Sequence, residues 1–572
     1  MDMTSIQAVP DSRGANLFEA DPRYAELLAL YLEPGLHAHL LPHLNRLGAL
    51  AGDALDRLAA TADQNPPVLH YRDRRGYDRE WIEKHPAYVE LERVAYADFG
   101  LAAMSHRGGV LNWPEPLPPL AKYALTYVFV QAEFGLCCPL SMTDSLTRTL
   151  RKFGAPELLA RYLPGLTATD MDQLTQGSMF ITEQEAGSDV GAVTTVARAQ
   201  GATWELTGDK WFCSNADASL ALVLARPEGA APGTRGLGLF LLPRVLPDGS
   251  ANRYRIIRLK DKLGSRDMAS GEIRMDGATA YLVGELGRGF AQMTDMINMS
   301  RLSNGVRAAG MMRRALTEAL HVARNRKAFG KLLIDLPLMR RQLLKLMLPA
   351  EQARSVFLMT ALELAKADQG DEQARRRVRI LTPLIKFRAC RDARRATGDA
   401  MEVRGGCGYI EEWSDPRLVR DSHLGSIWEG TSNIVALDVM RAIRREQSLD
   451  ALHADLSARL EHAGPLRKRL AAALERSVAL AGAAAAQKND ALARQAASAL
   501  YRVTAAVVMA QEAGRLAQDA RRALLADLVL EHHLEDRDPL APGETAREAG
   551  IAQALLGEQA LPARLVETLI KR

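Results

Sequence analysis

The order in which segment types follow one another is the feature that most constrains how this chain folds. Residues 1–178 show the helical spacing of apolar side chains, as in DPRYAELLALYL and HPAYVELERVAYADFGLAAM. Between these stretches, NPPVLHYRDRRGYDREW has the proline-opened, polar character of a loop. Residues 179–283 hold short β-rich runs such as LALVLARPE. Amphipathic helical patterns return in residues 284–445, and residues 446–572 are rich in alanine and leucine. We therefore expect an α+β protein with four domains at these boundaries.

Composition excludes some classes of function. Of the 572 residues, 47% are hydrophobic and 25% are charged, as in globular proteins with a large core. The formal net charge of +4 is small for this length, which excludes a globally basic nucleic-acid binder but not a local basic patch. The first residues lack a signal segment, and no apolar run is long enough to cross a bilayer. We expect a protein without a membrane partner.

Cysteine usage indicates the compartment. Five cysteines, an odd number without the spacing of a disulfide framework, favour reduced thiols and a cytoplasmic location. The adjacent pair Cys137 and Cys138 has no matching cluster of ligands, so we expect no metal site.

The stretch SIWEGTSNIVALDVMR places a carboxylate at an unusual corner. Glu429 stands between Trp428 and Gly430, and the apolar pattern of a helix begins a few residues later. One interpretation is a solvated loop in which Thr431 or Ser432 caps the helix. The other is a catalytic base: contact with Trp428 would desolvate the carboxylate and raise its pKa, and Gly430 would let a ligand approach the backbone.

Four motifs occur in the order that one enzyme family shows. ITEQEAGSDVGA at 181–192 resembles a signature with the core T-E-x-x-x-G-S-D, GDKWFCSNAD resembles a flavin-facing strand, and RNRKAFGKLL resembles an R-x-x-F-G-x-x-L turn. EVRGGCGYIEEWSDPRLVRDSHLGSIWEGTSNI resembles the second signature. Over roughly residues 90–445 the chain is similar to the acyl-CoA dehydrogenases, which are FAD-dependent flavoproteins. The resemblance implies an N-terminal helical domain, a middle β domain and a C-terminal four-helix-type domain, with residues 446–572 as an additional helical domain.

This resemblance implies the oxidation of an acyl-CoA thioester between Cα and Cβ. Glu429 would be the base that removes the α-proton while a hydride passes to flavin N5. Other branches carry the base two residues before an arginine matched here by Arg301, but that position holds Met299, which accepts no proton. Ser188, Arg301 and Gly430 would contact the substrate. The electrons would pass to an electron-transfer flavoprotein or a similar acceptor.

The resemblance also assigns the contacts to FAD. Thr182 would hydrogen-bond the pyrimidine edge of the flavin, Phe212 would cover the isoalloxazine, and Ser214 would bond near N5. Ser188 would reach a phosphate through backbone N–H groups of its turn. Taken alone, Thr182 and Ser188 are typical of turn chemistry, and Phe212 is typical of a core. The expected FAD contacts are Ile181, Thr182, Ser188, Phe212, Ser214, Arg326, Phe329, Gly405, Gly406, Gly430, Thr431 and Asn433.

Some of these contacts imply an assembly of subunits. Arg326 and Phe329 would reach the FAD of a neighbouring subunit, with Arg326 against its pyrophosphate. The pair Gly405-Gly406 would let the backbone approach the dinucleotide, and Thr431 and Asn433 would bind its adenosine half. The alternatives are a surface salt bridge for Arg326 and a plain helix stop for the glycine pair. We expect a homo-oligomer, specifically a homotetramer.

Departures from the mainstream family indicate one branch. Trp428 stands where most members carry Tyr, Ser214 where Thr is common, and Glu402 where Gln is common. Together with IWEG, KWFCS, RLKDKLGSRDMAS and the extra helical segment, these features resemble the AidB-like branch, the alkylation-response flavoproteins of bacteria. That branch is associated with DNA binding and with weak dehydrogenase activity. The alternative to a dehydrogenase is therefore a DNA-associated flavoprotein in which catalysis is vestigial.

DNA binding would need a concentrated basic face, because phosphate contacts supply most of the affinity. Residues 451–572 hold 16 lysines and arginines against 15 acidic residues, which is nearly balanced. Two basic clusters near the start of the fourth segment are candidates, and the alternative for both is a solvated helix face. The clusters are Arg441, Arg444 and Arg445, and Arg467, Lys468 and Arg469.

Overall fold

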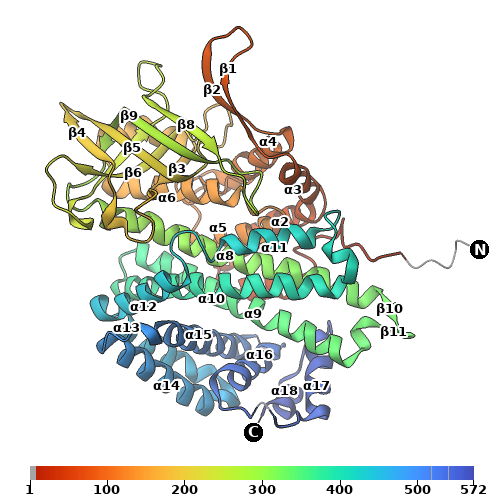
Figure 1. Ribbon diagram of the computed structural model, residues 1–572. Coiled ribbons are helices and arrows are strands. Elements are labelled where there is room, and N and C mark those ends of the chain that lie inside the picture. The colour runs from red at the N-terminus through yellow and green to blue at the C-terminus, as the bar shows by residue number, and fades with distance from the viewer. Residues whose placement is uncertain (1–7, 517, 539, 572) are drawn as a thin grey trace, which may run out of the picture. The chain divides into compact units, whose positions relative to one another are not determined.

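The computed structural model describes residues 8–516, 518–538 and 540–571. They form long helices and a seven-stranded sheet, so the mixed helical and sheet class expected from the sequence is confirmed (Figure 1). The chain divides into two compact units. The bounds of unit 1 are Met1–Asp53, Tyr123–Gln131 and Asn304–Arg572, and those of unit 2 are Ala54–Lys122 and Ala132–Ser303. The four domain boundaries expected from the sequence remain a prediction.

Unit 2 contains the sheet, in which strands close into a ring. The strands are β3 (Gly177–Phe180), β4 (Val196–Gln200), β5 (Thr203–Ser214), β6 (Leu220–Pro227), β7 (Gly238–Pro243), β8 (Tyr254–Leu259) and β9 (Ser270–Leu282). Strand β6 pairs in parallel with β4 and antiparallel with β7. The antiparallel pairs β4–β5, β5–β9 and β7–β9 complete the ring, while β3 pairs with β6 and β8 with β9. Closure of this kind removes unpaired strand edges, as in barrels.

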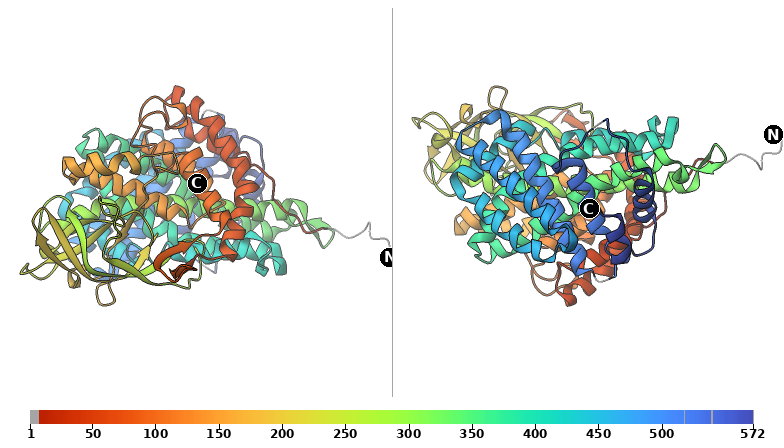
Figure 2. Two further views of the ribbon diagram at one scale, coloured as in Figure 1. Left: turned by 90° about the horizontal axis from the view of Figure 1, so that it is seen from above. Right: turned by 90° about the horizontal axis from the view of Figure 1, so that it is seen from below.

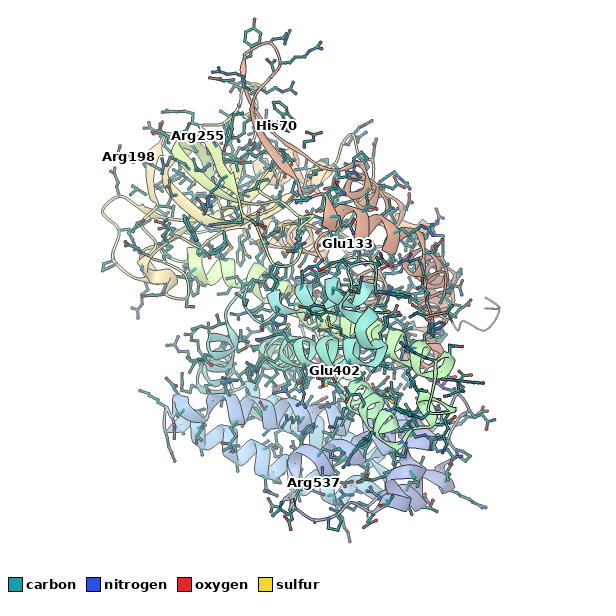
Figure 3. All side chains as sticks on the ribbon, turned by 45° about the vertical axis from the view of Figure 1, so that its right-hand side comes forward. His70, Glu133, Arg198, Arg255, Glu402 and Arg537 are labelled. Carbon is teal, nitrogen blue, oxygen red and sulfur yellow. The ribbon has the colours of Figure 1, made fainter. Side chains whose placement is uncertain are left out.

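The pattern of apolar side chains along each strand determines which of its residues are buried. Strands β6 and β7 read as continuous apolar runs, LALVLARP and GLFLLP, and nearly all their side chains are buried. Strand β8 alternates instead, so that Tyr254 and Ile256 enter the core of unit 2 while Arg255 faces outward (Figure 3). This core supports β5, whose last residues include Phe212 and Ser214.

The segment NPPVLHYRDRRGYDREW is a β-hairpin, and the expectation of a polar loop was wrong. Strand β1 (Val68–Arg72) pairs antiparallel with β2 (Asp78–Glu83). The rings of His70 and Trp81 stack across the pair with their centroids 4.5 Å apart. Cross-strand aromatic pairs stabilise a hairpin, and the two prolines lie before β1, where the missing N–H removes no ladder bond. Within unit 2 the hairpin projects beyond the sheet (Figure 3).

Helices complete unit 2. The stretch HPAYVELERVAYAD, expected to be helical, forms α4 (Pro86–Glu92) and continues as a π-helical turn over Arg93–Asp98. The other helices are α3 (Ala54–Gln64), α6 (Cys137–Phe153) and α7 (Pro156–Leu166). Helix α6 packs against β3. Two further helices, α5 (Pro119–Phe129) and α8 (Gly289–Asn325), have residues in both units.

Apart from a short hairpin of β10 (Lys327–Ala328) and β11 (Lys331–Leu332), unit 1 is built from helices. They are α1 (Pro22–Leu28), α2 (Pro34–Gly52), α9 (Pro337–Asp368), α10 (Glu372–Arg404), α11 (Ser414–Leu424), α12 (Ser432–Glu446), α13 (Ser448–Arg459), α14 (Arg467–Ala486), α15 (Ala493–Arg515), α16 (Arg521–Val529), α17 (Thr545–Leu556) and α18 (Ala563–Leu569). Helices α9 and α10 pack along each other, and α15 packs against both and against α14 (Figure 2). Within the part of the chain that the structure describes, no helix combines the length and apolar content needed to span a bilayer.

A buried network of charges joins three parts of unit 1. Arg354 of α9 pairs with Asp21, which precedes α1, and with Glu351 at 2.5 Å. Arg522 of α16 contacts Glu351 at 2.7 Å and Glu512 of α15 at 2.6 Å. All five side chains are buried, and their mutual pairing offsets the cost of removing these charges from water. The network holds α15 and α16 against α9.

Candidate active site

Glu429 lies at a strained corner of unit 1. Its φ is 54°, in the left-handed region, which costs a residue with a side chain about 1–2 kcal/mol. Gly430 follows with φ 102°, and α12 begins two residues later at Ser432. The Glu429 side chain is half-buried. A residue that the fold holds in an unfavourable conformation is a candidate for function.

The carboxylate of Glu429 has a neighbour on α8. Asn304 Nδ2 donates a hydrogen bond to Glu429 Oε2, and Trp428 Nε1 donates to Asn304 Oδ1 at 2.7 Å. Because an indole N–H only donates, the amide oxygen of Asn304 must face Trp428, and its NH₂ group then faces Glu429. Trp428 therefore orients the Glu429 carboxylate through Asn304. Asn304 was not among the site residues expected from the sequence.

Two buried cations support this corner. Arg307 Cζ lies 4.9 Å from the centroid of the Trp428 ring, and Lys386 Nζ donates a hydrogen bond to the carbonyl oxygen of Gly430. Both side chains are buried. Cys390 lies close by, and burial raises the pKa of its thiol to about 11. The thiol is therefore neutral near pH 7.

The start of α12 lacks a side-chain cap. Thr431 occupies the N-cap position, but its side chain makes no capping hydrogen bond. Both Thr431 and Asn433 are exposed. The capping role considered for Thr431 is thus not used, and the N–H groups of the first turn have no side-chain acceptor from the N-cap.

In unit 2, a buried ion pair holds the turn that carries Thr182. Glu183 accepts hydrogen bonds from Lys210 Nζ at 2.7 Å, from Thr195 Oγ1 at 2.5 Å and from Thr194 N at 2.7 Å. Burial acts to raise the pKa of Glu183, but Lys210 and these hydrogen bonds lower it to about 2. Lys210 Nζ also donates to the carbonyl oxygen of Ile181 at 3.3 Å. Glu183, the glutamate of the first motif, therefore holds the local structure of this turn.

Several of the expected FAD contacts in unit 2 have side-chain groups that are not engaged within the protein. Among the described residues, the hydroxyl groups of Thr182 and Ser188 form no hydrogen bond, so they are not used for turn chemistry. Phe212 is 57% exposed, which excludes the core-packing alternative. Ser214 is half-buried at the end of β5. Figure 1 shows β5 within the ring of strands.

The residues around the alternative base position also lie in unit 2, on α8. Met299 is buried. Arg301 is half-buried and its Nη1 donates to Asn298 Oδ1 at 3.5 Å. Glu429 therefore remains the candidate base that both the sequence and the local geometry indicate.

The remaining expected contacts lie in unit 1. Arg326 Nη1 donates to the carbonyl oxygen of Arg404 at 3.0 Å, and among the described residues it forms no ion pair, so the salt-bridge alternative is not seen. Phe329 is 94% exposed with φ 52°. Gly405 has φ 73° and ends α10, so it does serve as a helix stop. Glu402 faces outward on the last turn of α10 (Figure 3).

Buried ion pairs anchor the glycine turn. Arg404 directly precedes Gly405, and its guanidinium group contacts Glu318 at 2.6 Å and Asp415 at 2.7 Å. A Cβ atom added at Gly405 or Gly406 would meet nothing within 4 Å. The ion pairs of Arg404 hold the backbone in place, and the space beside Gly405 and Gly406 is open, so a ligand can approach this backbone closely.

These features fit FAD in each unit taken by itself. Unit 2 offers an exposed aromatic ring, unengaged hydroxyl groups and a glycine at 187 whose added Cβ would meet nothing within 4 Å. Unit 1 offers the open turn at Gly405 and the exposed Phe329. A dinucleotide needs this mixture, because its ring system packs on apolar groups and its phosphates bind N–H donors.

Comparison with known proteins identifies the class. The middle and C-terminal domain models of the acyl-CoA dehydrogenases match residues 178–278 and 287–444. The N-terminal domain model of the adaptive response protein AidB matches residues 7–173. AidB of Escherichia coli (strain K12) is 35% identical over 413 residues, covering 70% of this chain and 73% of that protein. Acyl-CoA dehydrogenase family member 11 of Caenorhabditis elegans is 28% identical over 445 residues, covering 76% of this chain and 72% of that protein.

Solved structures agree with these matches. The apo form of Bd2924 superposes with a TM-score of 0.81 at 31% identity, covering 89% of this chain and 99% of that one. The C. elegans protein ACDH-11 in complex with C11-CoA superposes with a TM-score of 0.86 at 25% identity, covering 94% of each chain. The chain therefore belongs to the acyl-CoA dehydrogenase family of flavoproteins, in its AidB-like branch.

The cluster of Arg467, Lys468 and Arg469, considered for DNA binding, is partly paired with carboxylates of unit 1. Arg469 pairs with Asp527 at 2.6 Å and with Glu535 at 2.7 Å, so its charge is neutralised within unit 1. Arg467 and Lys468 are exposed. Two side chains of this cluster, rather than three, are therefore available to a phosphate backbone.

Proposed function

We propose that this protein is an FAD-dependent acyl-CoA dehydrogenase whose catalytic base is Glu429. The observation that carries the proposal is the corner in unit 1, where a left-handed backbone presents the carboxylate and the amide of Asn304 holds one of its oxygens. Since each carboxylate oxygen has two lone pairs, this hydrogen bond leaves acceptor capacity for a proton. Membership of the family supports an oxidoreductase.

The reaction removes one hydrogen from each of two neighbouring carbons of an acyl-CoA thioester. Glu429 takes the Cα hydrogen as a proton, and the electron pair of that C–H bond becomes the second bond between Cα and Cβ. When bound, FAD supplies the acceptor for the hydride that leaves Cβ. Asn304 keeps the carboxylate in one orientation. Less conformational entropy is then lost when the carboxylate reaches the geometry for proton transfer, and this lowers the barrier.

The expected binding residues have roles that suit this chemistry. In unit 2, the hydroxyl groups of Thr182 and Ser214 hold the flavin ring and Phe212 covers it, while Ser188 and Arg301 contact substrate. In unit 1, Gly430 leaves space for the thioester beside the base. Arg326 and Phe329 reach the FAD of a neighbouring subunit in a homotetramer, and an electron-transfer flavoprotein or similar acceptor reoxidises the flavin.

The substrate class is a fatty acyl-CoA. The C. elegans relative was solved with C11-CoA, and it covers 94% of this chain at a TM-score of 0.86. We therefore expect turnover of medium to long acyl chains in preference to short ones.

The deciding experiment is an anaerobic titration of the purified, full-length flavoprotein with acyl-CoAs of short, medium and long chain. Bleaching of the flavin absorbance by one chain class supports the proposal and defines the substrate. A flavoprotein that none of them reduces, although dithionite does, would exclude the dehydrogenase.

The same assay tests the base. Glu429→Gln keeps an acceptor oxygen for Asn304 but cannot take the α-proton, so flavin reduction by acyl-CoA should slow on the order of a hundredfold or more. The FAD content should not change. A variant that reduces flavin as fast as the wild type would show that Glu429 is not the base.

A further inference from the structure

Two arginines of unit 1 contact the first turn of α12, and a third contacts the segment that precedes it. Arg391 and Arg394 lie on α10, and Arg494 lies at the start of α15. Arg391 Nη1 donates to Ser432 Oγ at 3.3 Å, and Arg494 Nη1 donates to Asn433 Oδ1 at 3.5 Å. Helices α10, α12 and α15 pack against one another. Guanidinium groups from two helices thus meet at the polar start of a third.

Among the residues that the structure describes, none of these three side chains forms an ion pair with a carboxylate, although Asp392 lies near enough to Arg391 to act on its charge. Arg394 Nη1 instead donates to Ser426 Oγ at 3.2 Å. Asp392, which lies between Arg391 and Arg394 on α10, accepts hydrogen bonds from Nε of Arg388 at 2.9 Å and from its Nη2. Arg391 is half-buried and Arg394 and Arg494 are exposed, so an anion can reach their guanidinium groups from solvent.

The electrostatics of Arg391 reflect this excess of positive charge. Burial, and then the neighbouring guanidinium groups of Arg494, Arg388 and Arg394, lower its pKa below the usual value for arginine. Like charges at close range disfavour one another. An anion placed among them would remove this repulsion.

We propose that Arg391, Arg394 and Arg494 form a binding site for the phosphate of a nucleotide-containing ligand. The planar guanidinium fork matches two oxygens of a phosphate, and phosphate is the anion that arginine clusters bind with the greatest geometric match. The uncapped first turn of α12 adds N–H donors on the same side. The proposal rests on the proposed function for the identity of the ligand, because FAD and acyl-CoA both carry nucleotide phosphates.

This site gives the C-terminal helices a part in ligand binding. Arg494 belongs to residues 446–572, which extend beyond the matched C-terminal domain of the family at 287–444. Its side chain reaches Asn433, an expected FAD contact on α12. The extra segment therefore contributes a charge to the site as well as packing against it.

The test compares Arg391→Gln, Arg394→Gln and Arg494→Gln in the full-length protein. Arg395→Gln is the matched control, because Arg395 is an exposed arginine on the same helix that pairs with Asp399 at 3.4 Å. Calorimetry measures inorganic pyrophosphate binding to flavin-free protein. We expect each of the three changes to weaken it on the order of tenfold, with a strong dependence on salt, and the control to leave it unchanged.

Two further measurements show whether the phosphate belongs to FAD or to CoA. If it belongs to FAD, the three variants release flavin faster on dilution, as followed by fluorescence. If it belongs to CoA, they lose any preference of the flavin-loaded protein for CoA over dephospho-CoA. Pyrophosphate binding that is absent, or equal in wild type and variants, overturns the site. A wild type that binds pyrophosphate through these arginines but is never reduced by acyl-CoA would retain the site and reject the dehydrogenase.

Discussion

At the scale of single residues, Glu429, the proposed base, is positioned through a chain of two hydrogen bonds. Trp428 sets the orientation of Asn304, and Asn304 sets the orientation of Glu429. Each bond has a defined direction because the indole only donates and the carboxylate only accepts. We regard Asn304 as a positioning residue, since it acts on the reaction through Glu429.

This role predicts a specific effect of Asn304→Asp. The new carboxylate can still accept from Trp428, so the local geometry is kept, but it places a second negative charge beside Glu429. Like charges disfavour ionisation, so the acid limb of the pH profile for flavin reduction should move to higher pH by about one unit or more. Stopped-flow reduction across a pH series measures this.

Gln352→Glu is the matched control for that prediction. Gln352 is also a buried amide of unit 1, and its Nε2 donates to the Leu348 carbonyl oxygen at 3.3 Å. The substitution Gln352→Glu should lower the stability of the protein without moving the acid limb of the pH profile for flavin reduction. An unchanged limb in Asn304→Asp would show that Asn304 serves the fold alone.

The limits of sequence reasoning are plain at this corner. Glu429 could be found because its neighbours Trp428 and Gly430 are adjacent in the chain and form a motif. Asn304 could not, because it lies 125 positions earlier and only the packing of α8 brings it to the carboxylate. Arg494 escaped notice for the same reason. The hairpin at β1 and β2 was missed because two prolines indicated a loop, whereas pairing across the strands decides its structure.

At the scale of elements, the turn that carries Thr182 depends on one buried ion pair. Lys210→Met should remove the partner of Glu183 and leave a buried charge uncompensated, which costs about 3–5 kcal/mol. Thermal unfolding should show a lower midpoint, and FAD content should fall because the turn is no longer held. Absorbance of the purified protein gives the flavin content directly.

A second ion pair in the same sheet is the control for this change. Arg274 of β9 contacts Asp209 of β5 at 2.6 Å, and both side chains are about half-exposed. Arg274→Met should cost only about 0–1 kcal/mol and keep the flavin. Equal losses in the two variants would mean that burial of the Lys210 pair has no special weight.

At the scale of the whole molecule, the exposure of Phe329 predicts an assembly. Phe329 is 94% exposed and belongs to the R-x-x-F-G-x-x-L turn, which in the proposed function reaches the FAD of a neighbouring subunit. We expect light scattering to give the mass of a tetramer, and Phe329→Arg to lower that mass and to weaken FAD retention. Leu540→Arg, at a leucine that is 90% exposed, should change neither. A wild-type protein that is monomeric with FAD bound would contradict the shared site.

DNA binding is also a property of the whole molecule. The exposed pair Arg467 and Lys468 predicts weak, sequence-independent binding that falls steeply with salt, because each neutralised phosphate releases counterions. Fluorescence anisotropy with duplex DNA across a salt series tests it in Arg467→Ala/Lys468→Ala. Arg469 is left in place because it pairs with Asp527. Tight binding at physiological salt that the double change does not affect would locate the contact elsewhere.

The buried charges that join α9 to the last helices bear on the history of this chain. If the gene ended after residue 445, Glu351 would lose Arg522, Ser355 would lose Glu512, and the faces that α15 covers on α9 and α12 would meet water. A module joined by a flexible linker can be gained or lost in one genetic event. Here the C-terminal helices share buried charges and packing with α9, so removing them would expose groups on α9 that the fold now buries.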